Sequence, residues 1–257
     1  MKRNFLSIAF LTFMVTLFVS QVSCDSQSVK DNTLTKKEIS EGWQLLFDGK
    51  SFDGWRLCNG TNVPPGWVIK DGAMKCLPRR EQPPRADGER GGTGGDILYG
   101  LKKFRNFEFS VDWNVGKGGN SGVFYSVVEY PGRPIYYAGV EVQILDNWNA
   151  GDNKLANHLA GSLYDILPAL PSNAKPSGEW NTLVIRIKDG KVTHTQNGVV
   201  VCEYTLWTPQ WYELVSKSKF ATWETFQEPN PAKEGYIGFQ DHGDFGCMFK
   251  NIKIREL

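Results

Sequence analysis

Short apolar runs separated by tight-turn dipeptides constrain the fold of this chain more than any other feature. Within residues 180–204, Asp189-Gly190 and Asn197-Gly198 separate three apolar runs. Such dipeptides suit two-residue hairpin turns, because both central residues can take positive φ. This stretch is therefore predicted to form a three-stranded antiparallel meander.

A second stretch alternates cleanly enough to predict which side of a strand is buried. Phe107, Phe109, Val111 and Trp113 share one face, and the polar residues between them share the other, as in a strand with one buried side. Further strands are predicted over residues 67–70 and 73–76 as a hairpin, and over 123–128, 136–145, 236–241 and 248–255. A short helix is predicted within 209–226, and a long loop over 79–95.

Many short strands with little helix place the chain in the all-β class. Such strands bury their apolar faces by packing two antiparallel sheets together, as a sandwich or jelly roll. We predict that residues 41–257 form this sandwich as one domain, since all-β domains often reach this size. The nine tryptophans fit either a thick core or a sugar-stacking surface.

The first residues have the pattern of an export signal. Two basic residues precede an almost wholly apolar run over residues 5–19, which is too short for a stable membrane span. We predict a signal peptide over 1–23, a lipid-modified Cys24 and a polar tether over 24–40. Gln21 departs from the aliphatic residue usual in lipoprotein signals. The protein is then expected in the periplasm or at the cell surface, attached to the membrane only through Cys24.

Charge and cysteine content narrow the classes of partner and site. A net charge of +1 gives no basic stripe, which argues against nucleic acid as a partner. Cys58, Cys76, Cys202 and Cys247 lack the paired spacing of a zinc site. They are predicted to be buried or incidental thiols, and Cys58–Cys76 is the favoured pair if a disulfide forms.

One predicted strand carries polar residues on the side away from the core. Val140, Val142 and Ile144 share one face, whereas Glu141 and Gln143 share the other, about 7 Å apart along the strand. A solvated outer face is the ordinary explanation of such alternation. Two tyrosines upstream and residues 146–148 downstream favour a lined cleft instead.

A second strand repeats this pattern near the C-terminus. Ile237 and Phe239 are predicted to face the core, and Gly238, Gln240 and His242 the opposite side. An imidazole here could act as a general acid or base, because its ordinary pKa lies near neutrality. A structural hydrogen-bonding role for this histidine is an equally open interpretation.

The remaining candidate residues lie in loops. His158 and Tyr164 could both transfer protons, although packing is the ordinary role of such a tyrosine. Three glycines around Asn120 would allow a ligand to approach the backbone closely. His194 is predicted to be structural. Glu141, His158 and His242 form a known type of ligand set for a divalent metal, but their spacing does not require one.

Seven segments in order resemble the 3-keto-disaccharide hydrolase family, over residues 42–257. They are residues 42–55 (GWQLLFDGKSFDGW), 118–124 (GGNSGVF), 140–147 (VEVQILDN), 178–181 (GEWN), 196–198 (QNG), 238–243 (GFQDHG) and 249–252 (FKNI). Two positions depart from the family pattern: Val140 replaces the usual tyrosine before the glutamate, and Lys250 replaces the usual arginine before Asn251.

The resemblance implies a concanavalin-like jelly roll that acts on glycosides whose 3-hydroxyl has been oxidised to a ketone. The ketone acidifies the hydrogen on C2, so a base can start an elimination that breaks the glycosidic bond, and water can then add to the product. The chemistry needs a base, an acid and a group that stabilises the enolate.

Motif positions of the family suggest roles for eight residues. Glu141, His158 and His242 would transfer protons, or hold a divalent metal if one is present. Asn120, Gln143, Asp146, Tyr164 and Gln240 would bind sugar hydroxyls. The resemblance does not say which residue is the base and which the acid.

Two other functions remain open from the sequence. A conventional glycosidase would pair Glu141 with a second carboxylate such as Asp146 or Glu179, and would cleave unoxidised glycosides. A non-catalytic carbohydrate-binding module would instead stack sugar rings on exposed tryptophans such as Trp148.

Overall fold

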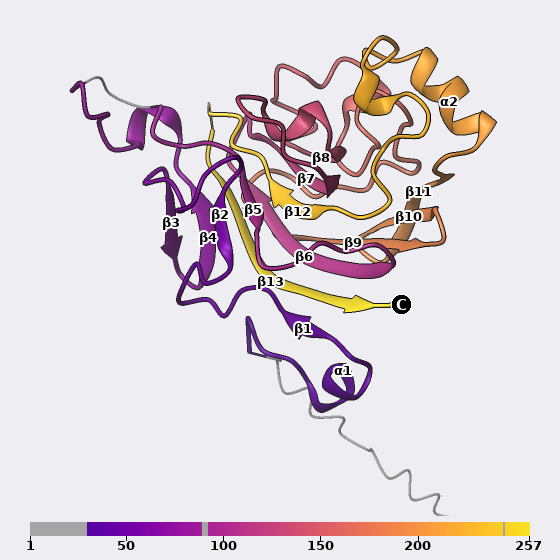
Figure 1. Ribbon diagram of the computed structural model, residues 1–257. Coiled ribbons are helices and arrows are strands. Elements are labelled where there is room, and N and C mark those ends of the chain that lie inside the picture. The colour runs from indigo at the N-terminus through magenta and orange to yellow at the C-terminus, as the bar shows by residue number, and fades with distance from the viewer. Residues whose placement is uncertain (1–29, 89–91, 244) are drawn as a thin grey trace, which may run out of the picture.

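The computed structural model describes residues 30–88, 92–243 and 245–257. Two antiparallel sheets pack face to face, with loops gathered above the smaller sheet (Figure 1). This arrangement confirms the predicted all-β jelly-roll sandwich. Within the described ranges, no helix is long and apolar enough to cross a membrane. The predicted signal peptide and Cys24 lie outside those ranges.

The order of strands in both sheets departs from their order in the chain. The larger sheet runs β11 (Val199–Thr205), β10 (Lys191–Gln196), β9 (Asn181–Lys188), β6 (Phe107–Val115), β13 (Cys247–Glu256), β4 (Ala73–Cys76) and β3 (Trp67–Lys70), with β1 (Gln44–Leu45) paired to β13. The smaller sheet runs β2 (Trp55–Leu57), β5 (Ile97–Tyr99), β12 (Tyr236–Phe239), β7 (Asn120–Val127) and β8 (Val140–Leu145). Strands distant in sequence therefore lie side by side.

Helical segments in the described residues are short and lie at the periphery. They are α1 (Lys36–Ser40), α2 (Pro209–Ser216) and the 3₁₀ turns η1 (Arg79–Glu81), η2 (Ile135–Tyr137), η3 (Ala156–His158) and η4 (Glu224–Phe226). The helix predicted within residues 209–226 is thus confirmed as α2, which begins with a Thr208 cap and a proline in its first turn.

Aromatic rings fill the space between the sheets. Phe107, Phe109, Val111 and Trp113 are all buried against the smaller sheet, as their alternation predicts. The ring of Phe239 lies between those of Trp55 and Phe249, at centroid distances of 5.0 and 4.0 Å. This stack ties β12 of the smaller sheet to β13 of the larger one.

The meander follows the turn chemistry of its sequence. Asp189-Gly190 and Asn197-Gly198 all adopt positive φ, at 49°, 82°, 50° and 80°, and join β9, β10 and β11 as predicted. His194 on β10 is buried, and its ring nitrogens contact Gly161 O and Tyr204 Oη, both at 2.9 Å. Burial lowers the pKa of this histidine to about 4, in keeping with its predicted structural role.

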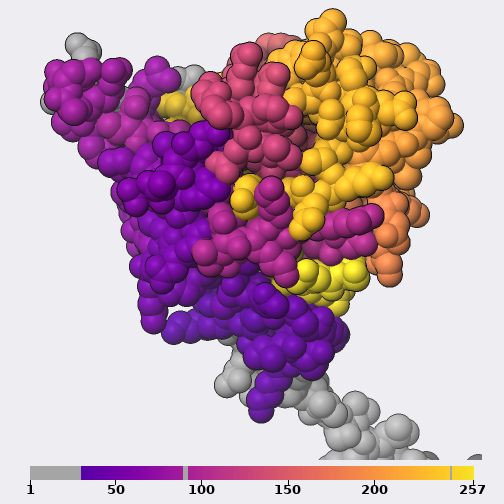
Figure 2. Space-filling view, in the orientation of Figure 1, coloured from indigo at the N-terminus to yellow at the C-terminus, as the bar shows by residue number. Residues whose placement is uncertain are grey.

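The polar tether predicted over 24–40 is wrong for the residues that the structure describes. Asn32 and Asn251 exchange two backbone-to-side-chain hydrogen bonds, of 2.6 and 2.9 Å. Lys250 pairs with Asp31 at 2.6 Å, and Lys253 pairs with Glu38. In the space-filling view, this N-terminal segment lies against the end of the C-terminal strand (Figure 2). Polar pairing to β13 holds the segment, so its lack of apolar periodicity was misleading.

The structure also shows whether the cysteines form a disulfide and whether the tryptophans lie in the core or at the surface. Cys58, Cys76, Cys202 and Cys247 are all free thiols, so no Cys58–Cys76 disulfide forms. Cys76 faces Cys247 across the β4–β13 pair instead. Most tryptophans belong to the core or to its edge, but Trp148 is 56% exposed.

Candidate active site

The outer face of the smaller sheet carries the candidate site, and strand register builds it. Gly122 on β7 lies opposite Gln143 on β8, and the N–H of Gln240 donates to Gly122 O at 3.0 Å. Gln240, Gly122 and Gln143 therefore form one row across three neighbouring segments. The next row places Phe124 opposite Glu141. The two polar stripes predicted from separate strands thus converge on one face.

A loop segment extends the smaller sheet beyond β8. Leu163 forms an antiparallel bridge with Val142, and the N–H of Tyr164 donates to Glu141 O at 3.1 Å. The Tyr164 side chain is therefore the cross-strand neighbour of Glu141. All six residues of β8 are buried, so the alternating polar residues here do not mark a solvated surface.

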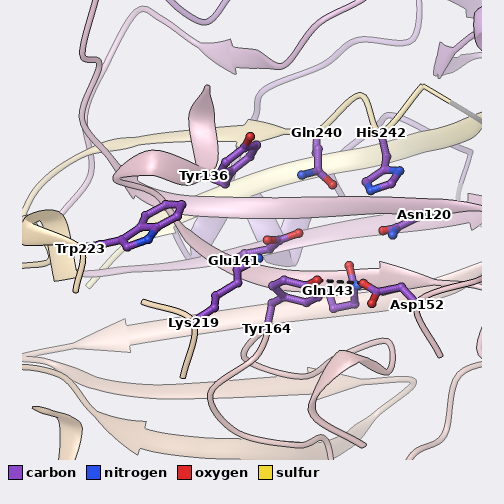
Figure 3. A pocket seen from close by; sticks show the side chains of 10 residues that line it. All are labelled: Asn120, Tyr136, Glu141, Gln143, Asp152, Tyr164, Lys219, Trp223, Gln240 and His242. Carbon is purple, nitrogen blue, oxygen red and sulfur yellow. Dashed lines mark hydrogen bonds between the residues drawn. The ribbon is translucent and has the colours of Figure 1, made fainter. Parts of the chain in front are cut away.

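These rows enclose a cavity of about 300 Å³. Its lining consists of Asn120, Tyr136, Glu141, Gln143, Asp152, Tyr164, Lys219, Trp223, Gln240 and His242 (Figure 3). Six of the eight predicted site residues are among them. Tyr136 and Trp223 stand at one end in this view, and Asn120, Asp152 and His242 at the other.

Gly122 leaves the space that the Glu141 carboxyl occupies. A Cβ atom at position 122 would lie 2.5 Å from Glu141 Oε1 and 2.8 Å from the Phe124 ring. Any side chain there would displace one of these groups. The glycine thus lies between two glutamines of the cavity lining, Gln143 and Gln240, and leaves room for the Glu141 carboxyl group.

The carboxyl group of Glu141 is buried without a hydrogen-bond partner among the described residues. Its side chain is 7% exposed, and none of its hydrogen bonds or ion pairs there involves the carboxyl group. Burial raises the pKa of Glu141 to about 8; the positive charge of Lys219 opposes this shift, and the negative charges of Asp96 and Asp152 add to it. Glu141 is therefore largely protonated at neutral pH, as a general acid must be.

Two amide groups in the lining have oxygen atoms without partners. Asn120 Oδ1 and Gln240 Oε1 are buried and accept no hydrogen bond from any described residue. Leaving such an acceptor unpaired costs about 1–3 kcal/mol. Both oxygens belong to residues that line the cavity, where a hydroxylated ligand could donate to them.

His158 does not line the cavity, so the structure does not bring it together with Glu141 and His242 there. Its Nδ1 contacts Asp152 Oδ1 at 2.7 Å, and its Nε2 contacts Asp165 Oδ1 at 2.8 Å. Tyr164 Oη donates to the other oxygen of Asp152 at 2.9 Å. His158 is therefore a positioning residue, which holds Asp152 and through it the Tyr164 hydroxyl.

Asp146 is the second predicted site residue that lies outside the cavity. It is 1% exposed, and its carboxylate accepts from the backbone N–H groups of Gly118, Trp148 and Asn149 and from the Asn149 amide. Burial acts to raise the pKa of Asp146, but these bonds outweigh it and hold the pKa below its usual range. Asp146 therefore fixes the loop that leads into Asn120.

Comparison with known proteins identifies the family to which this site belongs. Residues 42–255 match the model of the 3-keto-alpha-glucoside-1,2-lyase-like domain. The chain belongs to this family. A 3-keto-disaccharide hydrolase of Bacteroides thetaiotaomicron is 42% identical over 238 residues, which cover 85% of this chain and 79% of that protein.

Solved structures of similar proteins share the sandwich of this lyase-like domain. One, described as a "putative glycosyl hydrolase" from Parabacteroides distasonis, has 32% identity and a TM-score of 0.74, with 89% of this chain and 100% of that chain covered. A second with the same description and source has 26% identity and a TM-score of 0.65, with 84% and 99% covered. The protein is an enzyme of the glycosyl hydrolase type.

The metal-ligand set considered from the sequence is not assembled in this lyase-like domain. Glu141 and His242 line the cavity, but both ring nitrogens of His158 are occupied by Asp152 and Asp165. Among the residues described, no group of three or more His, Cys, Asp or Glu side chains is arranged to hold a metal ion. The three residues therefore do not fit a shared metal site.

Four lining residues of the domain were not predicted: Tyr136, Asp152, Lys219 and Trp223. Tyr136 belonged to the tyrosine pair noted upstream of Glu141, which was the available signal. The other three lie in loops without periodicity, and tertiary bonds bring them to the cavity. The N–H of Lys219, for example, donates to Asp165 Oδ2 at 2.6 Å.

Proposed function

We propose that this enzyme cleaves the glycosidic bond of 3-keto-glycosides by elimination, followed by addition of water. The observation that carries the proposal is Glu141: a buried, unpaired carboxyl with a pKa of about 8, in a cavity that also holds His242. The name of the 42% identical relative supports the substrate class.

The elimination begins at C2, next to the ketone. His242 is exposed and lines the end of the cavity away from Tyr136 and Trp223, and it takes the proton from C2. The electron pair left behind forms an enolate with the C3 ketone. The ammonium group of Lys219, 4.1 Å from the centre of the Tyr164 ring, supplies the positive charge that favours the enolate.

Collapse of the enolate breaks the bond between C1 and the leaving oxygen. The C3 ketone reforms, a C1–C2 double bond appears, and Glu141 gives its proton to the departing oxygen. Water then adds oxygen to C1 and a proton to C2, so the net reaction is hydrolysis. Asn120 Oδ1 and Gln240 Oε1, which are unpaired acceptors, receive hydrogen bonds from sugar hydroxyls throughout.

Isotope incorporation separates this route from direct hydrolysis. A 3-keto-disaccharide and its unoxidised parent would each be incubated with the enzyme in D₂O, and the sugar product analysed by mass spectrometry and NMR. We expect turnover of the keto substrate alone, with one deuterium at C2. The Glu141→Gln variant and the free keto sugar serve as controls for spontaneous exchange. Product that keeps hydrogen at C2, formed as fast as sugar is released, would rule out the elimination.

A conventional glycosidase is the second candidate, and one observation favours it. The partners considered from the sequence, Asp146 and Glu179, do not line the cavity, but Asp152 shares it with Glu141. Two carboxyl groups in one site could perform acid and base roles on an ordinary glycoside. Release of sugar from the unoxidised parent in the same experiment would support this candidate over the elimination.

We further propose that the protein is exported and anchored through a lipid on Cys24. The support is the basic and apolar pattern of residues 1–23. Metabolic labelling with a fatty acid, compared between the native chain and Cys24→Ser, tests this assignment. Equal labelling of both proteins, or none of either, would contradict it.

A further inference from the structure

Beyond Tyr136 and Trp223, the cavity adjoins a second hollow whose lining includes three aromatic rings. This hollow measures about 570 Å³, and its lining includes Arg133, Tyr136, Tyr137, Thr222, Trp223 and Glu224. We refer to these six residues as the aromatic ledge. Because Tyr136 and Trp223 line both spaces, a ligand bound at Glu141 can continue onto the ledge.

Two chain segments build the ledge and support each other. The Trp223 ring lies 6.3 Å from Tyr136 and 5.9 Å from Tyr137, centroid to centroid. Phe220 packs edge-on against the same indole at 5.3 Å. The Thr225 hydroxyl donates to Tyr137 O, which joins η2 to η4. The rings are thus held in place before any ligand arrives.

We propose that the ledge binds the leaving group of the glycoside, through a ring that has an apolar face. This inference rests on the proposed function. Aromatic side chains suit such a face because they bury apolar area at low entropic cost. Tyr136 is 39% exposed, so its ring is accessible to a bound group.

The position of the acid agrees with this direction. In Figure 3 Glu141 lies between the Trp223 end of the cavity and the Asp152 end. A leaving oxygen that departs toward the ledge therefore passes the protonated carboxyl. The opposite end opens into a hollow of about 420 Å³, which shares Asn120, Asp152, Tyr164 and His242 with the cavity and adds Gly118, Ala150, Gly151 and Phe245. Of the four residues that it adds, only Phe245 has a side chain large enough to contact a ring.

The test compares three 3-keto-glucosides that differ only in the leaving group: methanol, phenol or a second glucose. In Tyr136→Ala and Trp223→Ala, KM should rise about tenfold for the two ring-bearing substrates and much less for the methyl glycoside. Trp223→Phe keeps a smaller ring, so its KM for the two ring-bearing substrates should lie between those of the native enzyme and Trp223→Ala. Phe245→Ala, at the far end, should change the three KM values equally or not at all.

The outcomes distinguish failure of the ledge from failure of the proposed function. A selective loss with the disaccharide, the phenyl glycoside or both supports the ledge and tells whether a sugar or an aromatic aglycone occupies it. Equal losses on all three substrates, or a selective loss in Phe245→Ala, would overturn the ledge while the proposed function stands. Failure of the native enzyme on every keto substrate would overturn the proposed function and the ledge with it. Should Trp223→Ala not fold, Tyr136→Ala and Trp223→Phe decide.

Discussion

The carboxyl group of Glu141 on β8 occupies the space that a side chain at Gly122 on β7 would need. A Cβ at position 122 would stand 2.5 Å from Glu141 Oε1. The sheet itself thus determines where the acid sits, because the strand register that pairs β7 with β8 also leaves the gap for the carboxyl group.

Gly122→Ala should therefore abolish most activity without unfolding the protein. The added methyl displaces the carboxyl or the Phe124 ring, at a stability cost of about 1–3 kcal/mol, and we expect kcat to fall more than tenfold. Steady-state kinetics and urea unfolding measure the two effects. Gly116→Ala is the matched control, since its Cβ would make only an ordinary contact of 3.7 Å. Equal activity in the two variants would contradict the role assigned to Gly122.

Glu141→Gln should make the folded protein more stable, and increasingly so as the pH rises from 5 to 8. The native pKa is about 8 and the ordinary value is 4.5, so between these values the unfolded state ionises while the folded state keeps its proton. Each pH unit in that window costs the native protein up to about 1.4 kcal/mol, and the glutamine variant avoids this cost. Urea unfolding at pH 5 and pH 8 tests the trend. A stability difference that shrinks with rising pH would refute the raised pKa.

Lys219→Met should shift the alkaline limb of the kcat/KM profile to higher pH. Activity needs protonated Glu141, so the native rate should decline above about pH 8. The Lys219 charge lowers the pKa of Glu141, and its removal raises that pKa further. The overall rate should also drop, because the enolate loses its cation. Lys217→Met, two residues away and paired with Glu213 at the surface, should leave the limb in place. An unmoved limb in Lys219→Met would argue against coupling between the two groups.

Gln240→Leu should separate ligand binding from stability. Gln240 Oε1 is buried and unpaired, so its replacement by an apolar group of similar size should not destabilise the free protein. Its KM should nevertheless rise about tenfold, because a sugar hydroxyl loses its acceptor. Gln82→Leu should instead destabilise the protein and leave KM unchanged. The Gln82 amide makes three hydrogen bonds, to Leu77, Asp241 and Gly94, and all three would be lost. Thermal melts and kinetics on both variants provide the comparison, and a large loss of stability in Gln240→Leu would contradict it.

Strand residues of this site could be predicted because a period of two fixes which side chains share a face. Glu141 and Gln143 illustrate this, and so does the burial of the four alternating apolar residues of β6 that begin at Phe107. Asp146 could not be assigned in the same way. A carboxylate that caps a loop and one that binds a ligand look alike in sequence, and only the four donors around Asp146 distinguish them.

Loop residues were harder to predict for a different reason. Lys219 is held near the cavity by a bond from its N–H to Asp165, 54 residues earlier in the chain, and Asp152 is held by a bond to His158 within its own irregular loop. No local pattern encodes such a contact. His158 was predicted to be catalytic because an imidazole can transfer protons. In the structure its two ring nitrogens contact Asp152 and Asp165, and it supports the loop that carries them.

The docking of residues 30–40 onto β13 has a mechanical consequence. Asn32, Asp31 and Glu38 are bonded to the C-terminal strand of the larger sheet, whereas the cavity lies on the outer face of the smaller one. A force applied at residue 30 would therefore act first on β13, and the hydrogen bonds of β13 would transmit it to the rest of the eight-stranded sheet. Tension on residue 30 would thus reach the larger sheet first, whereas the candidate site lies on the other sheet.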